Sequence, residues 1–141
     1  MLLLNRQLQR SNIDVKTKLR ELPDAVVAAD QLRQVLSNLV INAKDSMPEG
    51  GTLQIRTRHV HHSKEYPLGS IRLLVADTGS GIPKELRKTV FEPFVTTKGE
   101  KGTGLGLWIV RGIIGNHGGK ISVKSKVGKG TVCKIELPAV R

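Results

Sequence analysis

The stretch QLRQVLSNLVINAKDSMPEGG, residues 31–51, decides the fold. Its apolar residues recur at intervals of three and four, and they are Leu32, Val35, Leu36, Leu39 and Ala43. This spacing places them on one side of an α-helix, so we predict a helix over residues 31–47 that buries the stripe. Asp30 is the expected N-cap, and Pro48 with the glycines after it ends the helix.

Strand patterns stand on both sides of this helix. Alternating or short apolar runs predict six strands, over residues 13–19, 25–29, 52–60, 71–77, 121–126 and 131–137. A second helix is expected over residues 105–116. Strands and helices in both halves of the chain predict an α/β fold, a two-layer sandwich in which helices cover one face of a mixed sheet. Residues 1–11 have helical spacing and are interpreted as the tail of an upstream helix, which leaves residues 12–141 as the domain.

Composition narrows the class of protein. The chain has 141 residues, 38% of them hydrophobic, which predicts one globular domain and excludes a disordered chain. A single cysteine, Cys133, excludes an internal disulfide. The 23 basic and 12 acidic residues give a net charge of +11, which indicates an anionic partner without choosing among nucleic acid, nucleotide, lipid and acidic protein. Aromatic residues make up only 3%, so stacking surfaces for single-stranded nucleic acid are not expected.

Three polar side chains follow one face of the predicted helix over residues 31–47. Asn38, Asn42 and Asp45 stand at positions i, i+4 and i+7. Two amides and a carboxylate on one face offer the oxygen ligands that Mg²⁺ takes beside phosphates. A solvated polar face explains the same pattern, so this helix by itself leaves both readings open.

Two glycine-rich segments carry the next candidates. DTGSGIP, residues 77–83, directly follows a predicted strand, so Asp77 can accept a hydrogen bond from an exocyclic amine while the glycines let a flat ligand approach. GTGLGL, residues 102–107, leads into the second predicted helix, where successive backbone N–H groups can bind phosphate. Its spacing differs from that of the dinucleotide and Walker A loops. A glycine-rich turn remains the alternative for residues 77–83.

The histidines do not form a convincing metal site. His59, His61 and His62 cluster between two predicted strands, but no carboxylate or cysteine stands at a matching spacing. We therefore interpret the cluster as a solvated basic loop. His117 lies before two glycines, and we interpret it as a helix-end residue.

Taken in order, the motifs resemble those of the ATP-binding catalytic domain of bacterial two-component sensor histidine kinases, in the superfamily that includes gyrase, Hsp90 and MutL. Residues 31–51 resemble the N box of that family, DTGSGIP its G1 box, FEPFVTTK its F box and KGTGLGL its G2 box. GKGTVCKIELP is similar to its last strand pair, with Thr131 at the G3 position. The form NAKDSM is closest to nitrogen-regulation-like and PAS-linked kinases. The resemblance implies the family's Bergerat fold with a flexible ATP lid, and ATP and Mg²⁺ as cofactors.

The resemblance also implies roles for individual residues. Asn42 would ligate the Mg²⁺, Asp77 would accept the adenine amino group, and Thr131 would lie nearby. Gly79, Gly81 and Ile82 would shape the adenine pocket. Phe91 and Phe94 would anchor the lid that carries Lys98. The phosphates would be wrapped by Gly102, Thr103, Gly104, Leu105 and Gly106.

Two positions depart from the patterns of relatives. Asn38 stands where hydrolysing relatives keep a glutamate as general base, and an amide cannot take a proton from water. The resemblance therefore implies phosphotransfer rather than fast hydrolysis, with Asn38 and Asn42 as the catalytic pair. Asp45 replaces a lysine found in another branch of the kinases, and the resemblance implies that it lies in the cofactor-binding site beside Asn42.

The sequence around the four histidines bears on where the phosphoacceptor of the expected kinase lies. None is followed by the acidic residue of the family's phosphoacceptor motif, so the acceptor is expected on a separate dimerisation domain, in a homodimer. A response regulator receiver domain is the expected partner, no nucleic acid is expected, and the resemblance implies a cytoplasmic domain of a protein whose membrane attachment is open. A serine kinase of the anti-sigma-factor type and a non-catalytic nucleotide-binding scaffold remain alternatives.

Most basic residues lie outside the nucleotide motifs, where a docking surface for an acidic partner or simple solubility accounts for them.

Overall fold

The computed structural model describes residues 2–93 and 106–140. Its helices and strands are, in chain order, α1 (Leu2–Arg10), β1 (Ile13–Lys18), α2 (Ala29–Asp45), β2 (Gly51–Val60), β3 (Ser70–Asp77), the 3₁₀ helix η1 (Lys84–Leu86), α3 (Gly106–Asn116), β4 (Lys120–Lys126) and β5 (Gly130–Pro138). Within these described ranges no helix has the length and apolar character needed to cross a membrane.

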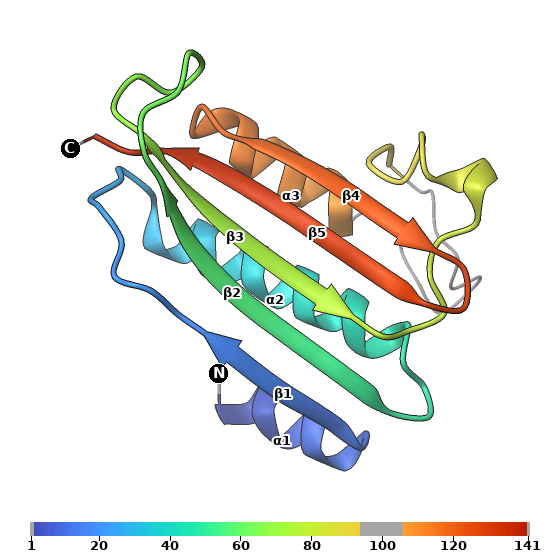
Figure 1. Cartoon of the computed structure of the whole chain (residues 1–141). Coiled ribbons are helices and arrows are strands. Elements are labelled where there is room, and N and C mark those ends of the chain that lie inside the picture. The colour runs from blue at the N-terminus through green and yellow to red at the C-terminus, as the bar shows by residue number, and fades with distance from the viewer. Residues whose placement is uncertain (1, 94–105, 141) are drawn as a thin grey trace.

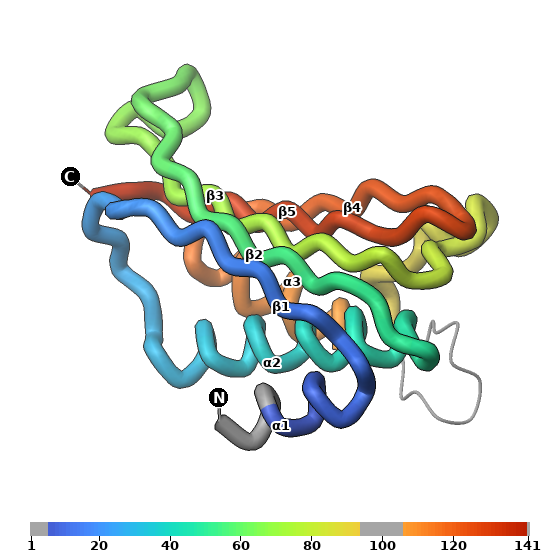
Figure 2. The backbone as a smooth tube through the Cα atoms, turned by 60° about the horizontal axis from the view of Figure 1, so that its bottom comes forward, coloured from blue at the N-terminus to red at the C-terminus, as the bar shows by residue number. Residues whose placement is uncertain are grey.

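The strands form one mixed sheet in the order β1-β2-β3-β5-β4. β1 pairs with β2 in parallel, and the other three pairs are antiparallel. Figure 1 shows α2 and α3 behind the sheet, and Figure 2 shows all three α-helices on the same side of it. The predicted two-layer α/β sandwich is thus confirmed, and no helix among the described residues lies over the opposite face of the sheet.

The core lies between α2, α3 and the covered face of the sheet. The predicted stripe of α2 supplies Val35, Leu39 and Ala43, each at most 3% exposed, and these pack with Leu53 of β2. Leu8 of α1 is also only 3% exposed and belongs to this core. The helix that precedes β1 is therefore packed onto the domain.

The predicted strand over residues 25–29 is wrong. Residues 19–28 have no regular structure, and α2 begins at Ala29 with Ala28 as its N-cap rather than Asp30. Val27 packs against the core and Val26 is 77% exposed, but the run pairs with none of the strands of the described sheet, so its backbone is not part of a β-ladder. Asp30 lies instead in the first turn of α2, where its carboxylate pairs with Arg33 at 2.7 Å.

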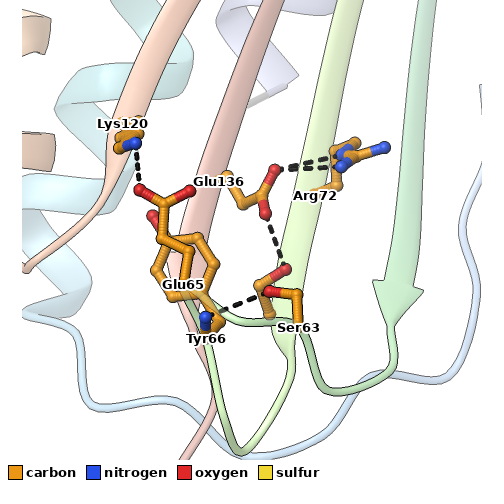
Figure 3. Close-up of polar contacts among 7 residues, drawn as sticks. Ser63, Glu65, Tyr66, Arg72, Lys120 and Glu136 are labelled. Carbon is orange, nitrogen blue, oxygen red and sulfur yellow. Dashed lines mark hydrogen bonds and ion pairs between the residues drawn. The ribbon is translucent and has the colours of Figure 1, made fainter.

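A polar cluster ties the β2–β3 loop to the sheet at the end where β3 begins (Figure 3). Glu136 of β5 accepts hydrogen bonds from Ser70 at 3.0 Å and from two guanidinium nitrogens of Arg72, at 3.2 and 3.1 Å. Glu65 in the loop forms an ion pair with Lys120 of β4. Ser70 is fully buried, so its hydroxyl depends on Glu136 for a partner.

Candidate nucleotide site

One face of α2 runs along the candidate site. The side-chain amide of Asn38 donates to the carbonyl oxygen of Gly106, the first residue of α3, at 3.4 Å. A Cβ on Gly106 would lie 3.5 Å from both polar atoms of the Asn42 amide, so this glycine approaches Asn42 closely. Ser46 continues the series one turn later. The three side chains span on the order of 12 Å along the helix, from the N-terminus of α3 toward the end of β3.

Asp77, the last residue of β3, stands at the other end of this line. Its carboxylate accepts a hydrogen bond from the backbone N–H of Gly79 at 2.9 Å, and the Ser46 side chain and the Thr131 backbone lie close enough to favour its charged form. Burial nevertheless raises the pKa of Asp77, because desolvation outweighs these three polar groups. No ion pair joins Asp77 to another residue of the described ranges. A partly desolvated carboxylate without a cationic partner can accept a hydrogen bond from an N–H group of a ligand.

The neighbouring Cys133 shows how apolar this environment is. Burial, and then the charge of Asp77, raise the pKa of the Cys133 thiol to about 12. The thiol is therefore protonated at neutral pH and packs as part of the core, as its alternating strand predicts.

The loop after Asp77 is held between α2 and the turn that joins β4 to β5. Gly79 lies against Ser46, where a Cβ would collide with the serine oxygens, and the Ser80 N–H donates to the Ser46 carbonyl at 3.0 Å. Gly81 has a φ of +79°, and a Cβ there would collide with the Lys126 carbonyl oxygen. The Ile82 N–H donates to the Ser125 hydroxyl at 2.7 Å. Glycine is needed at both positions because the loop approaches other backbone.

Thr131 lies directly beside this loop. It is the cross-strand partner of Asp77 in the pairing of β3 with β5. Its hydroxyl is 2.8 Å from the Ser125 hydroxyl, which also donates to the Gly130 carbonyl at 3.0 Å. The structure thus brings together five predicted residues from two segments of the chain, namely Asp77, Gly79, Gly81, Ile82 and Thr131.

The remaining predicted residues divide into two groups. Asp45 is exposed one turn beyond Asn42 on α2. Phe91 lies before the described range ends, and the Arg111 guanidinium of α3 lies 5.9 Å from its ring centre. The others lie outside the described residues, and they are Phe94, Lys98, Gly102, Thr103, Gly104 and Leu105.

Ser46 and Ser125 are site residues that sequence reasoning missed. Ser46 is four residues after Asn42, so the i, i+4 series of Asn38 and Asn42 points to it. Ser125 continues the alternation of Ile121 and Val123 on the covered face of β4, and a serine at a core-facing position is a polar group that needs a partner. Both signals are present in the sequence.

The histidine cluster forms no recognisable metal site. The rings of His59 and His61 lie 4.6 Å apart, centre to centre. Across residues 2–93 and 106–140, no three histidine, cysteine, aspartate or glutamate side chains gather in a way that would hold a metal ion.

Sequence comparison identifies the family. Residues 27–141 match the family described as histidine kinase-, DNA gyrase B-, and HSP90-like ATPase. The chain belongs to this family and is a catalytic domain of the histidine kinase type. The match starts just before α2 and includes both the α2 face and the end of β3.

Two curated relatives make the relation more specific. The chain is 48% identical over 117 residues to the sensor kinase CckA of Brucella abortus, which covers 77% of this chain and 12% of the relative. It is 41% identical over 145 residues to the sensory histidine kinase/phosphatase NtrB of Vibrio alginolyticus, which covers 99% of this chain and 41% of the relative. The chain thus spans well under half the length of these kinases. The resemblance to nitrogen-regulation kinases is confirmed.

Solved structures agree with the fold. The catalytic domain of histidine kinase ThkA matches with a TM-score of 0.80 at 33% identity, over 97% of this chain and 86% of that one. Full-length ShkA, solved in complex with AMPPNP, matches with a TM-score of 0.81 at 30% identity, over 97% of this chain and 28% of that one. ThkA has also been solved in complex with the response regulator protein TrrA, with a TM-score of 0.76 at 31% identity over 99% of this chain and 38% of that one. These names favour a histidine kinase over a serine kinase or a scaffold.

Proposed function

We propose that this chain binds Mg·ATP and transfers the γ-phosphoryl group to a histidine on a separate dimerisation domain. The observation that carries the proposal is the line of polar groups from Asp77 to Gly106 along α2, in a member of the histidine kinase family. The alignment of this line with the bound nucleotide is part of the proposal. In the transfer, the γ-phosphorus forms a bond to a ring nitrogen of the acceptor histidine. The bond to the bridging oxygen breaks, and its electron pair leaves with ADP.

Asp77 is proposed to bind the adenine amino group. Its carboxylate is partly buried, has no ion-pair partner in the described ranges and already accepts a hydrogen bond from the Gly79 N–H. An exocyclic amine supplies a further donor to this partly desolvated carboxylate. The glycines at 79 and 81 lie against Ser46 and the Lys126 backbone, so they hold the loop next to Asp77, where the adenine ring is proposed to bind.

The other end of the line is proposed to receive the phosphates. Asn42 faces the first residue of α3, and a helix N-terminus favours negative charge. Asn42 carries the proposed Mg²⁺ contact, with Asp45 one turn away, and amide and carboxylate oxygens fit that hard cation. The chemistry that Mg²⁺ supplies when bound is neutralisation of phosphate charge. Lys98 and the glycine segment 102–106 are proposed to close over the phosphates.

Asn38 is proposed to favour transfer over hydrolysis. Its amide nitrogen donates to the Gly106 carbonyl, so the side chain is engaged in holding the start of α3. An amide cannot deprotonate a water molecule. The role left for Asn38 is to position the N-terminus of α3 beside the phosphates.

The histidines of this chain are not proposed as acceptors. Both ring nitrogens of His117 are in use, since Nε2 accepts from the Ala28 N–H at 3.1 Å and Nδ1 lies 2.7 Å from the Ile113 carbonyl oxygen. The acceptor is placed on a dimerisation domain joined through α1, in a homodimer, with a response regulator receiver domain next in the relay. Leu8 supports this role for α1, because its burial in the core fixes the direction in which the helix leaves the domain.

The test separates nucleotide binding from transfer. Calorimetry with ATP, in the presence and absence of Mg²⁺, measures binding by the purified chain and by Asn42→Ala. We expect Mg²⁺ to strengthen binding by the wild-type chain and to have little effect on binding by Asn42→Ala. Gln34→Ala, which removes an exposed amide elsewhere on α2, is the matched control, and it should keep the Mg²⁺ dependence.

Transfer is measured with γ-radiolabelled ATP. The chain by itself should not become labelled, and adding the separately expressed dimerisation domain should produce acid-labile, base-stable phosphate on that domain. Acid-stable phosphate would identify a hydroxyl acceptor and overturn the histidine assignment. Labelling of the isolated chain would show that it contains an acceptor.

A further inference from the structure

The face of the sheet without helices is strongly basic. Because Leu53, Val75, Ile135 and Ile121 face the core, alternation places the intervening residues on the opposite face. The basic residues on that face are Lys16, Lys18, Arg56, Arg58, Arg72, Lys120, Lys124, Lys126 and Lys134. The acidic strand residues there are Asp14 and Glu136, and the loop residue Glu65 joins them through its ion pair with Lys120. The excess of six positive charges is most of the net charge of +11.

Most of these charges are not neutralised within the fold. Among the nine, only Arg72 and Lys120 form ion pairs with other described residues, to Glu136 and Glu65. The strand register aligns the other basic residues in rows that run across the sheet. One such row consists of Lys18, Arg56, Leu74, Lys134 and Ser122. Like charges on adjacent strands repel one another, so the isolated domain gains nothing from this arrangement.

The middle of the same face is apolar. Ala76 of β3 lies directly opposite Val132 of β5, and Leu74 is two residues from Ala76 on the same face. Val132 is 37% exposed, and the other two are half-buried. Arg56 and Lys134 flank Leu74 in register, so charged side chains surround the apolar strip. An apolar centre inside a charged rim is the usual form of a protein–protein interface.

We propose that this uncovered face, centred on Leu74, Ala76 and Val132 and rimmed by lysines and arginines, docks an acidic protein surface. The partner would present apolar side chains to the central strip and carboxylates to the rim. This proposal does not depend on the proposed phosphotransfer, because the face lies on the opposite side of the sheet from α2 (Figure 1).

Two other anionic partners fit this face less well. Single-stranded nucleic acid and membrane surfaces are commonly bound with aromatic side chains, and none of the outward-facing strand residues is aromatic. Glu136 also stands on this face, 3.1 Å from Arg72, where its carboxylate would repel phosphate groups. The apolar strip has no counterpart in a phosphate backbone.

The probes are two fluorescent peptides of equal length and charge, one of glutamate and glycine, the other of glutamate and leucine. Anisotropy is measured with the whole chain near physiological salt, beside a DNA duplex and vesicles containing phosphatidylserine. We expect the leucine peptide to bind about tenfold more tightly than the glycine peptide, the difference expected from burying one leucine side chain. Leu74→Ser/Val132→Ser should remove that advantage and leave any binding of DNA or vesicles unchanged.

Charge reversal supplies the matched control. Arg56→Glu/Lys124→Glu should abolish peptide binding, whereas Arg10→Glu/Arg33→Glu, an equal change at exposed helix positions, should not. All four positions are exposed, and the ion pair that Arg33 forms with Asp30 is screened by solvent, so each variant should remain folded, which its thermal unfolding curve checks. Excess Mg·ATP should not displace the peptide, and displacement would assign binding to the nucleotide site.

Three results would overturn the proposal. Equal affinity for the two peptides would show that the apolar strip takes no part. Tighter binding of DNA or vesicles than of the leucine peptide would assign the face to a phosphate-bearing partner. An absence of all binding would leave solubility as the role of the charge.

Discussion

Strands β3 and β5 carry a buried polar group at each end, and the two ends are built differently. Where β3 begins, the carboxylate of Glu136 is matched by the Arg72 guanidinium and the Ser70 hydroxyl. Where β3 ends, the Asp77 carboxylate receives only neutral hydrogen-bond donors, and burial raises its pKa. A carboxylate that is paired with a cation can stabilise the fold. A partly buried carboxylate without such a partner lowers the free energy of unfolding.

The two ends have close backbone contacts in common. A Cβ on Gly119 would collide with the Glu136 carbonyl oxygen, just as one on Gly81 would collide with that of Lys126. The difference between the ends is therefore the charge that meets each carboxylate, which agrees with a structural role for the Glu136 end and with the proposed ligand role of the Asp77 end.

The largest expected effect comes from filling the space that Gly81 leaves. Gly81→Ala should cost roughly 2–4 kcal/mol of unfolding free energy, since the left-handed backbone and the collision with Lys126 both oppose a Cβ. Urea unfolding measures the loss. Gly128→Ala is the matched control, because Gly128 has a φ of +78° but no atom within 4 Å of a Cβ. Equal losses of unfolding free energy in the two variants would show that the close approach of Gly81 to Lys126 contributes nothing to the loss.

Asp77→Asn should produce the next largest effect, on ATP affinity. An amide in place of the carboxylate presents a donor to the adenine amino group, and a mispaired buried polar group costs about 1–3 kcal/mol, or about 5–150-fold in affinity. Isothermal titration calorimetry with Mg·ATP measures this change. Wild-type affinity in the variant would remove Asp77 from the adenine site.

Glu136→Gln is the corresponding carboxylate-to-amide change at the other end. It should lower the unfolding free energy by about 1–2 kcal/mol, because Arg72 and the buried Ser70 lose a charged acceptor. The affinity for ATP should stay at the wild-type value. If Glu136→Gln weakened ATP binding as much as Asp77→Asn, the division of roles between the two ends would be wrong.

The helix that decides the fold was predictable because its signal is local. The periodic spacing of Val35, Leu39 and Ala43 needs no knowledge of the rest of the chain, and all three are buried. The run over residues 25–29 resembles a strand in composition, and the lack of a partner strand for it in the described sheet became visible only in three dimensions.

The candidate site was predictable in part for the same reason. Asp77 and the glycines at 79 and 81 are marked by their position after a strand. The contact of Ser46 with Asp77, and that of Ser125 with Thr131, join segments far apart in sequence, so they follow from the packing of α2 and β4 rather than from any motif.

A smaller effect should appear in the pH dependence of stability. Because the pKa of Asp77 is raised by folding, the native state binds more protons than the unfolded state between the ordinary aspartate pKa and the raised one. The stability of the wild-type chain should therefore fall, relative to Asp77→Asn, as pH increases through that window. Urea unfolding of both proteins from acidic to neutral pH measures the difference, and a rise with pH would contradict the desolvated state of Asp77.

The smallest expected effect belongs to the ion pair between Glu65 and Lys120, which lies at the same end as Glu136. Lys120→Gln should leave the urea midpoint unchanged, because both side chains are more than half exposed and solvent screens their attraction. Arg72 and Glu136, which are 27% and 16% exposed, are screened much less. Glu136→Gln therefore serves as the positive control at this end. A loss in Lys120→Gln equal to that in Glu136→Gln would mean that stability there comes from closing the β2–β3 loop rather than from the buried carboxylate.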